Sequence, residues 1–84
     1  MAYTIELLPT AFRELEELPA RIRAQIGRRI VALADERRPA NAKMLRGQER
    51  YFRIRSGDYW VIYMLEDVVV VVVKVGHRRE VYRR

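Results

Sequence analysis

The amino-acid sequence predicts one α+β domain, in which an N-terminal strand and a two-helix hairpin precede an antiparallel sheet (β-α-α-β-β-β). Apolar residues recur at helical spacing through the first part of the chain. From Tyr51 onward they instead alternate or form continuous β-branched runs. The chain has 84 residues, a length that suits one small domain. We therefore expect residues 1–84 to form a single domain without repeats or linkers.

The first half of the chain predicts one strand and two helices. The segment YTIELL, Tyr3–Leu8, alternates weakly and is rich in β-forming residues. Pro9 opens a first helix, and Pro19 ends it and begins a second one. The first helix is expected to bury Phe12, Leu15 and Leu18 and to turn Glu14, Glu16 and Glu17 outward. The second helix is expected to bury the stripe formed by Ile22, Ile26, Ile30 and Leu33.

The second half of the chain predicts a loop followed by three strands. Residues 37–50 show no sustained period and indicate a connecting loop with room for one helical turn. The strands are expected at Tyr51–Arg55, Asp58–Leu65 and Val68–Val75. Turns at residues 56–58 and 66–67 join them. The valine run is apolar enough to lie in the middle of the sheet, covered on both faces for much of its length.

The pairing of strands predicts which face of the sheet carries Trp60, the only tryptophan. Directly opposite residues of antiparallel strands lie on the same face. A two-residue turn at 56–57 or at 57–58 places Arg53, Arg55 and Trp60 together, whereas a three-residue loop would reverse the faces. The opposite face, toward the helices, would then carry Phe52, Ile54, Tyr59, Val61 and Tyr63.

The sheet face that carries Arg53, Arg55 and Trp60, here called the arginine face, is expected to be apolar in the middle and cationic at the rim. Across the turn at 66–67, we expect Trp60 beside Val73 and Ile62 beside Val71. Such a surface favours contact with a partner protein and a nucleic acid. Coverage of this face by a loop or by the C-terminal tail is the alternative.

The charge of the chain is uneven. Lys and Arg number 17 against 11 Asp and Glu, for a net charge of +6. Residues 42–84 hold ten of these cations and five of the anions, and nearly all the cations are arginine. The planar guanidinium suits bidentate contacts with phosphate, which favours a polyanionic partner. A solvated basic surface that only aids solubility is equally open on charge alone.

Several classes of protein are disfavoured. The chain contains no cysteine, which removes disulfides and thiolate chemistry. It has no apolar segment of membrane-spanning length and no secretion signal at its N-terminus. We therefore expect a cytoplasmic protein without a membrane partner.

The last ten residues, VGHRREVYRR, concentrate groups that can carry chemistry. Gly76 is expected to end the last strand and to turn the chain toward the arginine face. That turn would bring His77, Arg78 and Tyr82 close to the strand arginines. A frayed basic tail is the alternative interpretation.

The residue types limit the chemistry that such a cluster could perform. No acidic residues show metal-ligand spacing, and neither a Ser-His-Asp pattern nor a phosphate-binding glycine loop is present, so no metal or cofactor is expected. Metal-independent RNA cleavage needs a proton acceptor, a proton donor and cations around the reacting phosphate. Arginine stabilises charge but rarely transfers protons. His77 and Tyr82 are therefore the candidate proton carriers of the cluster.

The segments MAYTIEL, AFRELEELP, IRAQIGRRI and KMLRG, followed by YFRIRSGDYWVIY and VVVVVVKVGHRREVYRR, closely resemble the RelE/ParE superfamily of toxins from type II toxin–antitoxin systems. The resemblance is nearest to the RelE branch and covers essentially the whole chain. It implies a compact α+β toxin that enters the ribosomal A site and cuts mRNA there. It also implies a cognate antitoxin that neutralises the toxin, with operator DNA bound only through the antitoxin complex.

The resemblance also implies roles for individual residues. Relatives commonly read GDYRVIY, with a catalytic arginine at the position that Trp60 occupies here. The catalytic positions carried over are Arg53, Arg55, Trp60, His77, Arg78 and Tyr82. The residues expected to bind RNA are Lys43, Arg46, Arg50, Arg79, Arg83 and Arg84.

Trp60 leaves alternatives open. Losing one preorganised charge contact lowers a rate by a factor of about 10²–10³. A tryptophan can instead stack on a base, which is worth roughly 1–3 kcal/mol. The chain is thus either a naturally weakened or altered toxin or one that carries an inactivating substitution. Two other functions are also open: a non-nucleolytic ParE-like toxin that inhibits DNA gyrase, and a co-repressor that only binds antitoxin and operator DNA.

Overall fold

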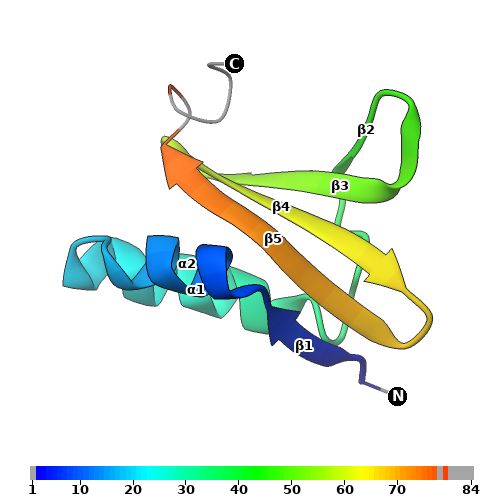
Figure 1. Ribbon diagram of the computed structural model, residues 1–84, viewed down its shortest axis with the longest axis horizontal. Helices are drawn as coiled ribbons and strands as arrows, with labels where there is room; N and C mark the ends of the chain where they lie inside the picture. The colour runs from blue at the N-terminus through cyan, green and yellow to red at the C-terminus, as the bar shows by residue number, and fades with distance from the viewer. Residues whose placement is uncertain (1, 78, 80–84) are drawn as a thin grey trace.

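The computed structural model describes residues 2–77 and residue 79. Its sheet has the strand order β1-β5-β4-β3-β2, and two helices pack on one face (Figure 1). β1 pairs with β5 in parallel, and the other neighbouring strands pair antiparallel. The predicted α+β class is therefore confirmed. The strands are β1 (Thr4–Leu7), β2 (Lys43–Leu45), β3 (Gln48–Ser56), β4 (Tyr59–Glu66) and β5 (Val69–His77).

The two helices begin where the prolines predict. Helix α1 spans Pro9–Glu16 and helix α2 spans Ala20–Ala32, with Pro19 as the N-cap residue of α2. The proline ring fixes φ near the helical value, and its missing N–H would be unsatisfied at a helix start in any case. The predicted stripe of α2 is confirmed, because Ile26, Ile30 and Leu33 are buried and Ile22 is partly buried against the core.

The buried face of α1 differs from the predicted one. Phe12 is 53% exposed, whereas Ala11 is fully buried. Ala11, Leu15 and Leu18 follow the spacing i, i+4, i+7 and form the stripe that packs against the core. The predicted outward position of Glu14 is also wrong, because its carboxylate reaches β5 and bonds Lys74 and Val75.

The core lies between the helices and the sheet face that was predicted to meet them. Phe52, Ile54, Val61 and Tyr63 are all buried there. The rings of Phe52 and Tyr63 stack with centroids 5.8 Å apart. The Tyr63 hydroxyl donates a 2.7 Å hydrogen bond to the Arg37 carbonyl. Burial disfavours the phenolate and raises the pKa of Tyr63 to about 12, although the nearby charge of Arg38 acts in the opposite direction.

Two predictions about the sheet are wrong. The segment expected to be a loop contains β2, a three-residue strand that pairs with β3. The pairing of β4 with β5 is also shifted, so that Trp60 lies opposite Gly76 and Ile62 opposite Lys74. The turn lies at residues 67–68, with Asp67 in the left-handed region at φ 57°, and Val73 is an extra residue in β5.

No helix in the part of the chain that the structure describes is long and apolar enough to cross a membrane.

Candidate functional site

A tight turn at Gly57 and Asp58 sets the arrangement of the arginine face. The register pairs Ser56 with Tyr59 and Arg55 with Trp60, which selects the second of the two predicted turns. Gly57 has a φ of 63°, a conformation that a residue without Cβ adopts most readily. The predicted placement of the two strand arginines with Trp60, away from the helices, is therefore confirmed.

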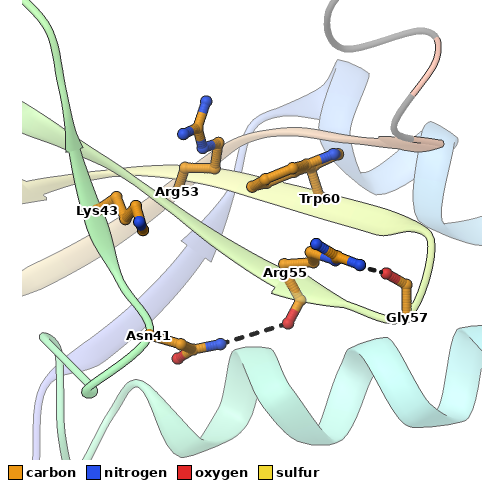
Figure 2. A pocket seen from close by; sticks show the side chains of 6 residues that line it. All are labelled: Asn41, Lys43, Arg53, Arg55, Gly57 and Trp60. Atoms are coloured by element: carbon orange, nitrogen blue, oxygen red, sulfur yellow. Dashed lines mark hydrogen bonds between the residues drawn. The ribbon is translucent and has the colours of Figure 1, made fainter.

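A pocket of about 490 Å³ opens on this face. Its lining combines three cations with one large aromatic ring, and Figure 2 shows these side chains on β2, β3 and β4. Lys43 was predicted as an RNA-binding residue, and its pairing with Arg53 across β2 and β3 places it here. The lining residues are Asn41, Lys43, Arg53, Arg55, Gly57 and Trp60, and they include no acid.

Arg53 and Trp60 form the central contact of the pocket. The guanidinium carbon of Arg53 lies 4.4 Å from the centroid of the Trp60 ring, within the range of a cation–π interaction. Both residues are partly buried. The two residues are diagonal neighbours on one sheet face, a separation that long side chains can span. The aromatic ring thus orients a positive charge inside the pocket.

Two hydrogen bonds hold the neighbouring Arg55. Its Nε donates a 3.0 Å hydrogen bond to the Gly57 carbonyl, which ties the side chain to the turn (Figure 2). Asn41 lies just before the short strand β2, and its side-chain amide donates a 3.4 Å hydrogen bond to the backbone carbonyl of Arg55. Asn41 is a pocket residue that the sequence analysis missed, because it lies in a segment without periodicity. The other guanidinium nitrogens of Arg55 can donate to an anion in the pocket.

His77 does not approach the strand arginines as predicted. Gly76 does not end β5 but pairs with Trp60, and the next residue, His77, pairs with Tyr59 on the opposite face. The rings of His77 and Tyr59 meet edge to face with centroids 5.3 Å apart. Both line a separate hollow of about 370 Å³ beside Glu14 and Glu17 of the helix hairpin. His77 Nδ1 accepts a hydrogen bond of 3.2 Å from the backbone N–H of Arg79.

The remaining predicted cations lie elsewhere. Arg46 follows β2, and Arg50 forms an exposed ion pair of 3.0 Å with Glu66. Neither of them lines the pocket, and Arg79 does not line it either. Four further predicted residues lie outside the described part of the chain: Arg78, Tyr82, Arg83 and Arg84. Among residues 2–77 and 79, no group of three or more His, Asp or Glu side chains is arranged to hold a metal ion.

Known proteins resemble this chain in fold and in sequence. A family model described as the ParE toxin of the type II toxin–antitoxin system, parDE, matches residues 5–82. Toxin RelG of Mycobacterium tuberculosis is 37% identical over 89 residues, covering 100% of both chains. The mRNA interferase toxin RelE of Escherichia coli K12 is 34% identical over 88 residues, covering 98% of this chain and 92% of that protein. The crystal structure of the toxin–antitoxin complex RelBE2 from M. tuberculosis gives a TM-score of 0.80 at 33% identity, over 93% of this chain and 100% of that one.

Proposed function

The chain belongs to the RelE/ParE superfamily of toxins from type II toxin–antitoxin systems, and from this premise we propose that it is a metal-independent endoribonuclease that cuts mRNA at the ribosomal A site. One observation carries the proposal. The pocket combines Lys43, Arg53 and Arg55 on a rigid sheet and has no acid in its lining. Such a site suits a phosphate whose negative charge increases during the reaction.

The proposed reaction uses the RNA itself as the nucleophile. The 2′-oxygen forms a bond to the adjacent phosphorus, and the bond from phosphorus to the 5′-oxygen breaks. The products are a 2′,3′-cyclic phosphate and a 5′-hydroxyl end. The three cations stabilise the charge that develops on the non-bridging oxygens, where preorganised donors have their largest effect. One proton leaves the 2′-hydroxyl, and one is delivered to the 5′-oxygen.

Proton transfer needs a group other than the pocket arginines, which remain protonated. Of the two candidates in the sequence, His77 faces the helix side of the sheet. We therefore assign proton transfer to Tyr82, which lies outside the described residues. Arg78 is proposed to add a further positive charge.

Trp60 lowers the expected rate of this reaction. The family resemblance implies an arginine at this position, and the loss of one preorganised charge contact typically costs a factor of about 10²–10³. We therefore propose a weakened toxin, in which Lys43, Arg53 and Arg55 supply the remaining charge. A cognate antitoxin is the proposed protein partner, consistent with the toxin–antitoxin complex among its structural neighbours. Operator DNA is then contacted only through that complex, and the protein acts in the cytoplasm.

A second candidate function is inhibition of DNA gyrase. The observation that favours it is the match of residues 5–82 to the family model described as ParE toxin. The cations that line the pocket favour the nuclease instead, because their charge suits a reacting phosphate. A regulatory protein that binds antitoxin and operator DNA without toxicity is the third possibility.

The decisive experiment compares this chain with its Trp60→Arg variant in a cleavage assay on ribosomes programmed with a defined mRNA. We expect slow cleavage by the chain itself and cleavage faster by about 10²–10³ after the substitution. A parallel assay measures DNA supercoiling by gyrase. Gyrase inhibition without cleavage by either form would contradict the nuclease and support the second candidate. Activity in neither assay would leave the regulatory role.

A further inference from the structure

We propose that the pocket binds a nucleobase of single-stranded RNA by stacking it against the Arg53–Trp60 pair, with the adjacent phosphate held by Lys43 and Arg55. This inference deepens the proposed function, on which its biological meaning rests. It assigns Trp60 a binding role of its own, namely stacking a base, in addition to its effect on the charge of the pocket. Single-stranded RNA is the substrate class, because a base within a duplex has no free face to stack.

The backbone around Trp60 provides a rigid platform. Trp60 lies in β4 and pairs with Arg55 on one side and with Gly76 on the other. The Arg53 guanidinium lies over the ring at 4.4 Å and restricts its orientation. A platform that is already ordered loses little conformational entropy when a ligand binds.

The chemistry of the pocket matches the two parts of a nucleotide. Aromatic rings and guanidinium planes are the groups on which proteins stack the bases of single-stranded RNA. Arg53 and Trp60 provide one of each in direct contact. Lys43 and Arg55 provide the positive charge that a phosphate needs, and both line the same pocket. The volume of about 490 Å³ lies within the usual range for small-ligand sites, roughly 300–1,000 Å³.

If bases stack against this pair, the affinity for RNA should depend on the presence of bases but little on which bases they are. Every base has a π-face, so binding through stacking tolerates changes of base. An RNA without bases keeps its phosphates and its charge but loses the stacking contact. We therefore expect an abasic oligonucleotide to bind about fivefold or more weakly than one with bases, as the usual strength of base–aromatic stacking implies.

The single tryptophan makes this test direct, because all the tryptophan fluorescence of the chain arises at the pocket. Two short 2′-O-methyl RNA probes are compared, one with adenine bases and one abasic with the same number of phosphates. The 2′-O-methyl group prevents cleavage during the titration. We expect the adenine probe to quench the fluorescence of Trp60 and the abasic probe to bind weakly with little quenching.

Variants are compared by the anisotropy of labelled probes, which does not require tryptophan. Trp60→Phe keeps an aromatic ring and is expected to keep most of the preference for the adenine probe. Trp60→Ala removes the ring without adding a guanidinium on which a base can stack, and is expected to bind both probes more equally. Arg28→Ala, an exposed position on α2 outside the pocket, is the matched control for loss of one arginine. Far-UV circular dichroism verifies that each variant is folded.

Equal binding and equal quenching by the two probes would overturn the inference, as would an adenine preference that persists unchanged in Trp60→Ala. Failure of the proposed function has a different signature. If neither the chain nor Trp60→Arg cleaves mRNA on the ribosome but the adenine preference depends on Trp60, the stacking site stands and the nuclease is wrong. If cleavage occurs but the probes bind alike, the nuclease stands and the stacking site is wrong.

Discussion

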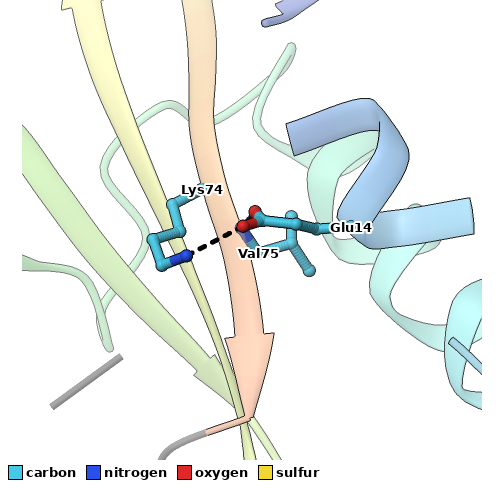
Figure 3. A network of polar contacts seen from close by, with 3 residues as sticks. All are labelled: Glu14, Lys74 and Val75. Atoms are coloured by element: carbon cyan, nitrogen blue, oxygen red, sulfur yellow. Dashed lines mark hydrogen bonds and ion pairs between the residues drawn. The ribbon is translucent and has the colours of Figure 1, made fainter. Parts of the chain in front are cut away.

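Glu14 of helix α1 accepts a hydrogen bond of 2.9 Å from the backbone N–H of Val75 in β5 (Figure 3). β1 covers this edge of β5 only as far as Val72, and the Glu14 carboxylate satisfies a backbone donor beyond that point. The same carboxylate forms a 2.8 Å ion pair with Lys74. A helix side chain thus supplies a hydrogen-bond acceptor to β5 where the neighbouring strand β1 no longer does.

Replacing Glu14 is expected to separate these two contacts. Glu14→Ala leaves the Val75 N–H without its acceptor and should lower the free energy of unfolding by about 1–3 kcal/mol. Glu14→Gln keeps an oxygen for that N–H and loses only the partly exposed ion pair with Lys74, so its cost should be below about 1 kcal/mol. Urea denaturation measures both values.

Glu16→Ala is the control, because Glu16 is an exposed residue of the same helix. An equal loss of stability in Glu14→Ala and Glu14→Gln would show that the ion pair, and not the backbone contact, stabilises the fold.

The role of Glu14 could not be predicted from helical periodicity. The pattern assigns residues to faces of α1, but the choice between Ala11 and Phe12 as the buried residue depends on how closely the helix approaches β5. Ala11 allows a close approach, and Phe12 then faces solvent. The side of the helix that carries Glu14 comes to lie beside the sheet edge as a result. Tertiary contact, which the local sequence does not contain, decides the outcome.

That interpretation predicts that substitutions at two adjacent positions change the free energy of unfolding by very different amounts. Phe12→Ala should change the free energy of unfolding by no more than about 0.5 kcal/mol, because the ring is 53% exposed. Ala11→Leu should lower it by about 1–3 kcal/mol, because a fully buried site has no room for added atoms. Thermal and urea denaturation give these values. A larger loss of stability in Phe12→Ala than in Ala11→Leu would indicate that Phe12, as the periodicity predicts, lies on the buried face of the helix.

The sequence determined some strand pairings and left others open. Arg53 and Arg55 alternate with buried residues along β3, so a slip would bury charge, and the glycine turn fixes the length of the hairpin. The placement of Trp60 was predictable for this reason.

The valines of β5 resemble one another on both faces, and nothing in their order distinguishes one register from the next. The extra residue Val73, and with it the position of His77 on the helix side, was therefore not predictable. Asn41 and Lys43 come to the pocket through β2, which is too short to show a pattern.

Tyr63 is expected to make stability depend on alkaline pH. Its pKa is raised to about 12 in the folded protein from an ordinary value of 10.0. The unfolded chain therefore loses this proton first, and the contribution of Tyr63 to stability is complete below pH 10 and declines as the pH rises toward 12. The loss amounts to about 3 kcal/mol at most.

Tyr63→Phe removes the titrating group and should flatten this decline, although it also loses the hydrogen bond to the Arg37 carbonyl, at a cost of about 1 kcal/mol. Urea denaturation at several pH values between 9 and 12 provides the measurement, and Tyr51→Phe, in the neighbouring strand β3, is the control for loss of a phenol. A decline of equal slope in Tyr63→Phe would assign the alkaline loss of stability to other groups.

The salt dependence of RNA binding should separate phosphate contacts from stacking. Each cation that neutralises one phosphate of a single strand contributes about −0.7 to the slope of log K against log salt concentration. Lys43→Ala and Arg55→Ala should each weaken binding of the adenine and abasic probes by the same factor and make the slope shallower by about that amount. Trp60→Phe should keep the slope of the unsubstituted chain, because the ring carries no charge. Arg28→Ala, on the helix side, should leave both affinity and slope nearly unchanged at moderate salt. If the substitutions at Lys43 and Arg55 altered the slope no more than the one at Arg28, the pocket would not be the site where this chain holds the RNA backbone.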